Sequence, residues 1–162
     1  MTALLMTPRA DRTARAVAPV RGQIRIPARR RVALYVTTAG TLASGLLWLV
    51  FHDFIHTQGE FGPVASPLEP WWLRLHGAMA FACLWFFGLL WGAHIVNGWT
   101  ARRRRWSGGA MFGLAAFLIV SGYLLYYSGD ERLRDLTSVA HWGIGVAAPL
   151  VFIWHRFWKR DA

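Results

Sequence analysis

Histidine offers the most chemistry in this sequence, and none of its six copies lies in the basic N-terminal segment. His76 and His94 are eighteen residues apart, which is about five whole turns of an α-helix. His141 and His155 are fourteen residues apart, which returns to within about 40° of the same helix face. Each couple therefore shares one helix face. Ionisable residues inside apolar helices are functional candidates.

Four apolar runs must position these histidines. Hydrophobic residues make up 55% of the 162, with 10 Trp and 10 Phe, more than a soluble domain of this size usually carries. A bilayer core of about 30 Å needs about 20 apolar residues in a helix, and strand alternation is absent. The sequence predicts an all-α fold, an integral membrane four-helix bundle in one domain over 31–158. The expected spans are about 32–52, 71–97, 107–127 and 137–157.

Charge predicts the orientation of these spans. Fifteen of the eighteen Lys and Arg lie before the first span, between the second and third, and after the fourth. Six of the eight acidic residues lie in the other two loops. Lys and Arg accumulate on the cytoplasmic side, so both termini are expected to be cytoplasmic. A net charge of +10 that is sorted in this way indicates a lipid-facing protein rather than a nucleic-acid partner.

This topology makes the second and fourth spans parallel, so their histidines match in depth. His76 is expected to pair with His141 near the outer surface, and His94 with His155 near the inner surface. A haem b iron takes two axial nitrogens from opposite sides, and parallel helices supply them directly. Two haems are predicted, on the order of 20 Å apart, with one haem at the outer pair as the alternative. The four-residue difference in spacing requires different tilts, a local kink or a His155 that reaches back.

Two arginines lie next to the expected haem sites. Arg74 and Arg156 could pair with haem propionates, although snorkelling to the membrane interface explains them equally well. Small residues leave space beside a macrocycle, but they also let plain helices pack closely. These residues are Gly77, Ala80, Gly88, Gly92, Gly143, Gly145 and Ala148.

His52 and His56 form a secondary candidate site at the end of the first span. Their i, i+4 spacing places both rings on one side if the helix continues, with Asp53 nearby. Such a site could bind a divalent metal or a quinone headgroup, or replace His76 as an outer ligand. A wet interfacial pair without a ligand is the simpler interpretation.

The remaining segments carry no expected chemistry. Residues 1–30 combine Arg, Pro and Ala and are predicted to form a disordered cytoplasmic tail against anionic lipid. The loop over 53–70 holds five Gly and Pro and is expected to be irregular, and the second outer loop should have about ten residues. Cys83 stands alone in an apolar span, so it offers neither a disulfide nor a CxxC metal site.

Several motifs in these spans resemble those of the small diheme b-type cytochromes of bacterial inner membranes. That group includes cytochrome b561 and the membrane subunits of hydrogenases and formate dehydrogenases. The resemblance covers about 32–158, in layout rather than as a close match to one member. Relatives that bind haem through the first helix have a mid-span histidine there, which this chain lacks. The motifs are Leu75-His76-Gly77, Ala93-His94 with Asn97-Gly98-Trp99, Gly122 to Tyr127, Ala140-His141-Trp142-Gly143 and Trp154-His155-Arg156.

The resemblance implies an electron-transfer subunit of an oxidoreductase complex in the bacterial inner membrane. It would pass electrons between the quinone pool and a periplasmic redox partner such as a c-type cytochrome, while the haem carries the redox chemistry. Rival hypotheses are a haem-free four-helix protein that binds or transports metal or protons, and a structural anchor for a larger complex. Midplane carboxylates, which transporters often use, are absent from the spans. Catalysis by the chain alone is not expected.

Overall fold

The computed structural model describes residues 27–102 and 104–157. Four long helices, α1, α2, α4 and α5, account for most of them, and each is long and apolar enough to cross a membrane. Helix α2 continues through a π-helical segment, η1, into the short helix α3. The all-α, four-helix expectation is therefore confirmed at this level. The bounds are α1 Ala28–Asp53, α2 Glu69–Leu90, η1 Trp91–Val96, α3 Asn97–Thr100, α4 Arg105–Tyr127 and α5 Glu131–Phe157.

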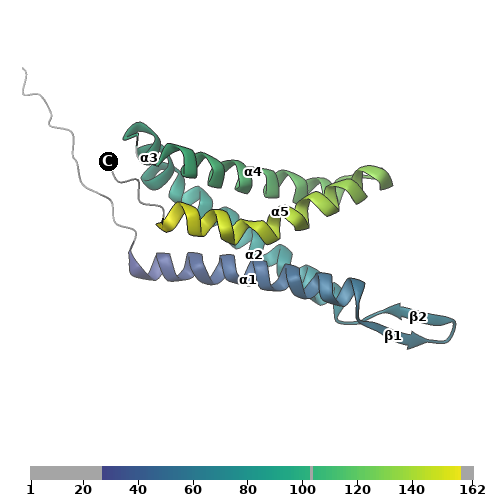
Figure 1. The fold of residues 1–162 in the computed structure, drawn as a ribbon. Helices are drawn as coiled ribbons and strands as arrows, with labels where there is room; N and C mark the ends of the chain where they lie inside the picture. Colours follow the sequence, from purple (N-terminus) through teal and green to yellow (C-terminus); the bar gives the residue numbers. More distant parts are fainter. Residues whose placement is uncertain (1–26, 103, 158–162) are drawn as a thin grey trace, which may run out of the picture.

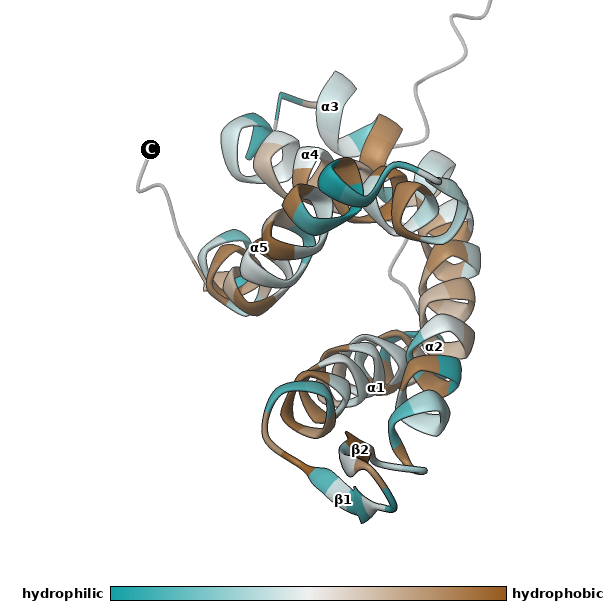
Figure 2. Ribbon diagram, turned by 90° about the vertical axis from the view of Figure 1, so that its right-hand side faces the viewer, coloured by the Kyte–Doolittle hydropathy of each residue, from teal (hydrophilic) through white to brown (hydrophobic). Residues whose placement is uncertain are grey.

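The helices run back and forth between two ends of the bundle (Figure 1). We call them the hairpin end, which carries the strands β1 and β2, and the α3 end. Helix α1 packs closely against α2, and α4 packs closely against α5. Because each long helix runs opposite to the one before it, α2 and α5 run in the same direction, from the hairpin end to the α3 end. Figure 2, turned by 90° from Figure 1, shows α1 beside α2 and α5 beside α4.

Apolar side chains lie on the outside of this bundle. No apolar side chain within 27–102 and 104–157 is buried, whereas four serines are: Ser44, Ser66, Ser107 and Ser121. Phe81 on α2 is 76% exposed and Leu150 on α5 is 70% exposed. Apolar surface on this scale marks contact with lipid or protein. Helices in lipid pack through small residues rather than through a buried apolar core.

The segment over 53–70 is more regular than expected. Strands β1, His56–Gly59, and β2, Gly62–Ala65, pair in an antiparallel hairpin in which His56 lies opposite Ala65. Gly62 has a φ of +124°, which L side chains rarely adopt, so the glycine allows the tight two-residue turn. The Gly and Pro content therefore marks a hairpin turn here and not an irregular loop.

The second loop is shorter than the ten residues expected, because α5 begins at Glu131. The side-chain oxygen of Asp130 accepts a hydrogen bond of 2.7 Å from the backbone N–H of Leu133, which caps the helix.

At the opposite end of the bundle, α1 begins at Ala28, so residues 28–30 of the predicted tail are helical. The rest of that tail, residues 1–26, lies outside the described residues.

Candidate functional site

Two pairs of histidine rings join α2 and its π-helical extension to α5. The rings of His76 and His141 have centroids 6.2 Å apart with an interplanar angle of 84°. The rings of His94 and His155 have centroids 6.1 Å apart at 88°. We call them the hairpin-end pair and the α3-end pair. The structure thus brings together the four histidines that the sequence analysis matched by depth.

The ring separation fits two imidazoles on one metal ion. A metal–nitrogen distance of about 2.0 Å on each side, with about 1.1 Å from nitrogen to ring centre, gives roughly 6.2 Å between centroids. Ordinary edge-to-face aromatic pairs fall in the same range. The distance alone therefore does not distinguish a metal site from packing, and the hydrogen bonds of the rings are needed to decide.

Both rings of the hairpin-end pair are held through Nδ1. The Nδ1 atom of His76 lies 2.9 Å from the carbonyl oxygen of Thr41 on α1. A carbonyl only accepts, so Nδ1 carries the hydrogen and Nε2 keeps its lone pair. The Nδ1 atom of His141 lies 2.7 Å from the hydroxyl of Ser121 on α4. Ser121 donates its own hydrogen to the Phe117 carbonyl at 2.7 Å, so it accepts from His141.

This pattern leaves the Nε2 nitrogen of each ring without a hydrogen, and such a nitrogen can bind a metal ion. Histidines that bind metal usually donate their other N–H to a carbonyl or similar acceptor, which fixes the tautomer and ring orientation. Within 27–102 and 104–157, no side chain or carbonyl forms a hydrogen bond with Nε2 of His76 or His141. Two neutral rings that both keep their Nε2 lone pairs cannot hydrogen-bond to each other through these atoms.

The α3-end pair is held more loosely. The Nδ1 atom of His155 lies 3.2 Å from the hydroxyl of Ser107, which itself is 3.4 Å from the Arg104 carbonyl. Among the described residues, none accepts a hydrogen bond from His94, whose side chain is exposed. The guanidinium of Arg104 donates to the carbonyl of His155 at 2.8 Å and to that of Arg156 at 3.2 Å, and so caps α5.

Glycines follow the serines and make room for three of the rings. A Cβ at Gly45 would lie 3.0 Å from Nδ1 and Cε1 of His76. The corresponding distances to Cε1 are 3.6 Å from Gly122 to His141 and 3.8 Å from Gly108 to His155. Small residues on α1 and α4 therefore let the rings approach the neighbouring backbone.

The sequence analysis missed these Ser-Gly dipeptides, although they carried a signal. Three stand inside apolar helices: Ser44-Gly45, Ser107-Gly108 and Ser121-Gly122. Ser107 and Ser121 are fourteen residues apart, the same spacing as His141 and His155. Because α4 and α5 are antiparallel neighbours, equal spacings place a serine beside each histidine.

Two helix irregularities accompany the unequal spacing of the histidines. His94 lies in the π-helical segment η1, where each turn takes more residues than in an α-helix. Pro149 lies inside α5 between His141 and His155 and cannot donate to the carbonyl of Gly145. Helix α5 bends along its length (Figure 1). The sequence analysis named a local kink as one way to reconcile the eighteen-residue and fourteen-residue spacings of the histidines, and a bend is present in α5.

The two arginines expected beside the haems stack on aromatic neighbours. The Arg74 guanidinium carbon lies 4.8 Å from the centre of the Trp71 ring. That of Arg156 lies 5.4 Å from the centre of the Phe157 ring. Cation–π contacts of this kind suit side chains at a membrane interface. Pairing of either arginine with a propionate remains a prediction.

The secondary site at His52 and His56 lacks the helix that it required. Helix α1 ends at Asp53, and His56 is the first residue of β1, so the i, i+4 relation on one helix face does not exist. His52 instead stacks on Trp48 at 4.7 Å and contacts the carboxylate of Glu69 at 2.7 Å. The expected helical relation between these two histidines is therefore wrong, and a ligand shared by them remains a prediction.

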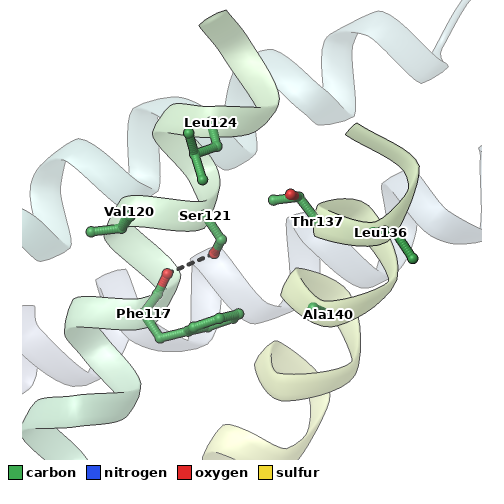
Figure 3. A pocket seen from close by; sticks show the side chains of 7 residues that line it. All are labelled: Phe117, Val120, Ser121, Leu124, Leu136, Thr137 and Ala140. Carbon is green, nitrogen blue, oxygen red and sulfur yellow. Dashed lines mark hydrogen bonds between the residues drawn. The ribbon is translucent and has the colours of Figure 1, made fainter. Parts of the chain in front are cut away.

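An apolar groove separates α4 and α5 toward the hairpin end (Figure 3). Neither histidine of the hairpin-end pair lines it, but Ser121, which holds His141, does. Figure 3 shows the Ser121 hydroxyl bonded to the Phe117 carbonyl at the groove wall. The groove therefore lies behind the pair and is not the space between its rings. It is lined by Phe117, Val120, Ser121, Leu124, Leu136, Thr137 and Ala140.

Comparison of the chain with protein-family models, curated proteins and solved structures found no match. The resemblance to diheme cytochromes therefore rests on the sequence motifs alone.

The residues of both pairs fit haem iron. Each pair offers two imidazole nitrogens, and within the described ranges no third His, Cys, Asp or Glu gathers with either. Haem supplies the other four nitrogens itself, so two protein ligands complete the coordination. Helices α2 and α5 are not among the closely packed couples, and nothing lies within 4 Å of a Cβ placed at Gly77 or Gly143. A side chain at either glycine would therefore meet no other described part of the chain.

Proposed function

We propose that this chain is a membrane-embedded b-type cytochrome that binds two haems and carries electrons between the two sides of the bacterial inner membrane. The observation that carries the proposal is the hairpin-end pair. There, two rings from parallel helices lie 6.2 Å apart, and the Nδ1 hydrogen of each is committed to a neighbouring helix. The α3-end pair repeats the separation at the other end of the bundle.

The protein's contribution is ligation and positioning. Haem iron at each pair would alternate between Fe(II) and Fe(III) and so carry one electron at a time. The Thr41 carbonyl and the Ser121 hydroxyl keep Nδ1 protonated and Nε2 available on His76 and His141. Ser107 lies within hydrogen-bonding distance of His155 Nδ1. Helices α1 and α4 hold the ligand helices from outside, because the serines and glycines that contact the rings belong to them.

Charge supports an orientation with both termini in the cytoplasm. Arg102, Arg104 and Arg105 lie at the α3 end, and Glu60, Glu69 and Glu131 lie at the hairpin end. Basic residues accumulate on the cytoplasmic side of bacterial inner-membrane proteins. The hairpin end would then face the periplasm and meet a redox protein such as a c-type cytochrome, while the quinone pool exchanges electrons within the membrane.

An optical spectrum of the detergent-purified protein tests the haem proposal. We expect about two haems per chain and a b-type spectrum after dithionite reduction. His76→Ala and His141→Ala should each lose the same haem and retain the other, because each substitution removes one of two axial ligands. His56→Ala is the matched control, since His56 lies in β1 and should leave both haems in place.

Protein from haem-replete cells that is colourless would overturn the proposal. Metal binding and proton flux in reconstituted vesicles would then test the same histidines as a haem-free site. Two haems that survive His76→Ala and His141→Ala together would equally contradict the assigned ligands.

Labelling of single cysteines in intact cells tests the orientation. In a Cys83→Ala background, a membrane-impermeant maleimide should label Glu60→Cys at the turn of the hairpin and should not label Arg102→Cys. Permeabilised cells, in which both should react, provide the control. The reverse pattern would place the hairpin end in the cytoplasm.

A further inference from the structure

The two pairs differ in how strongly their Nδ1 atoms are hydrogen-bonded. In the hairpin-end pair both bonds are short, 2.9 Å to the Thr41 carbonyl and 2.7 Å to the Ser121 hydroxyl. In the α3-end pair one bond is longer, 3.2 Å to Ser107. No described residue accepts from His94, which is the exposed member of the four.

These hydrogen bonds change the electron-donating power of an axial imidazole. An acceptor on Nδ1–H makes the ring more basic and a stronger donor to the metal. A stronger donor stabilises Fe(III) relative to Fe(II) and so lowers the reduction potential, for which second-shell hydrogen bonding is one of the protein's levers. The bonding pattern therefore predicts a lower potential at the hairpin end.

Fixed charges also raise the reduction potential of the α3-end site relative to that of the hairpin-end site. Arg104 bonds to the His155 carbonyl at 2.8 Å, with Arg105 beside it in sequence. Positive charge disfavours Fe(III), which carries one charge more than Fe(II), and so raises the potential of the α3-end site. The hairpin end carries charges of both signs, because on α2 Arg74 lies two residues before His76 and Glu69 seven residues before it. Among the described residues the α3 end carries arginines only, so positive charge distinguishes the α3-end site.

We infer that the hairpin-end haem has the lower reduction potential of the two, with Ser121 and Ser107 acting as positioning residues that set the difference through His141 and His155. This inference rests on the proposed function and deepens it by assigning a direction. An electron that enters at the hairpin end moves toward the α3 end with the gradient.

Redox titrations of one-haem variants test the order of the potentials. His155→Ala should retain the hairpin-end haem, and His76→Ala should retain the α3-end haem. The first should titrate at the lower potential, with at least a tenfold difference in the Fe(III)/Fe(II) equilibrium, about 59 mV for a one-electron couple. Equal potentials, or the reverse order, would overturn the inference while leaving the proposed function intact. Absence of haem from the unmodified protein would instead defeat the proposed function.

Substitution of the serines tests their role separately. Ser121→Ala should raise the potential of the hairpin-end haem, because His141 loses its acceptor, and Ser121→Thr should restore the original value. Ser107→Ala should raise the potential of the α3-end haem by less, since its bond is longer. Ser128→Ala is the control, because Ser128 follows α4 and its hydroxyl is hydrogen-bonded, among the described residues, to the Asp130 N–H alone. An unchanged hairpin-end potential in Ser121→Ala would contradict the role. If Ser121→Ala loses the haem, the potentials of Ser121→Thr and Ser121→Cys test the role of Ser121 instead. A hairpin-end potential in Ser121→Cys equal to that of the unmodified protein would contradict this role.

Discussion

The hairpin-end and α3-end pairs have the same ring separation but are built in different ways. At the hairpin end, His76 and His141 lie in regular α-helix, and each donates to a neighbouring helix. At the α3 end, His94 lies in a π-helical segment, and His155 follows Pro149 by six residues. The irregularities thus gather around one pair. The comparison indicates that a second histidine pair was accommodated by distorting the helices rather than by repeating the first arrangement.

The neighbouring helices account for the rest of the difference. Helix α4 supplies a serine to both pairs, whereas α1 supplies its carbonyl and glycine to the hairpin-end pair. His94 has no such support among the described residues. An imidazole ring whose Nδ1–H donates to a neighbouring acceptor is fixed in tautomer and orientation, whereas a ring without such a hydrogen bond can rotate. Rigidity should therefore differ between the two sites even where the ligands are identical.

The largest expected effect is the loss of a whole site. His155→Ala should leave one haem per chain, and so should His94→Ala, because each iron has only two protein ligands. Haem content relative to protein checks this result. Retention of two haems in His94→Ala would show that the exposed His94 ring is not a ligand. Only the hairpin-end histidines would then remain as a pair of ligands.

A substitution at Gly45 should affect only the hairpin-end pair. The Cβ of Gly45→Ala would lie 3.0 Å from the His76 ring, so the ring must move. We expect at least a twofold loss of the hairpin-end haem and a stability loss of about 1–3 kcal/mol from overpacking. Haem content and thermal unfolding measure both. Gly113→Ala, at an exposed position of α4 where an added Cβ meets nothing within 4 Å, should leave both values unchanged.

Pro149→Ala should affect only the α3-end pair. The new N–H can donate to the Gly145 carbonyl, which straightens α5 and shifts His155 relative to His94. In a His76→Ala background, where only the α3-end haem remains, we expect a severalfold drop in haem occupancy. An unchanged occupancy would mean that the bend does not align this pair.

The smallest effect is expected at the contact between His52 and Glu69, which belongs to neither pair. His52 is 52% exposed, so Glu69→Gln should change stability by no more than about 1 kcal/mol. Haem content should stay at two per chain. A loss of haem in this variant would show that the His52–Glu69 contact affects haem binding at the hairpin-end pair, and would contradict its assignment to neither pair.

The sequence was sufficient for the large features of the fold. The lengths of the apolar runs predicted four helices long and apolar enough to cross a membrane. The alternation of charge predicted that the second and fourth helices are parallel. Helical periodicity then predicted that His76 lies near His141 and His94 near His155. These inferences depend on repeated features over many residues, so errors of a few residues in helix ends do not change them.

Local features decided by one or two atoms were harder to predict. The helix start at Glu131 depends on a single Asp130 oxygen, and the hairpin depends on the conformation of Gly62. The Nδ1 partner of His76 is a backbone carbonyl, which every residue possesses, so no residue type marks it. The Ser-Gly dipeptides were visible, but their meaning depends on the register of α4 against α5, which only the packed structure supplies.

The opposite charges at the two ends of the bundle also bear on the energised membrane. With the α3 end on the negative, cytoplasmic side, the transmembrane voltage opposes each electron that moves toward it by about 2.3 kcal/mol per 100 mV. The basic α3 end and the acidic hairpin end bias the same electron in the opposite sense. In a protein with the proposed haems and orientation, fixed charge would thus partly offset the membrane voltage, and an electron would be shared more evenly between the two ends.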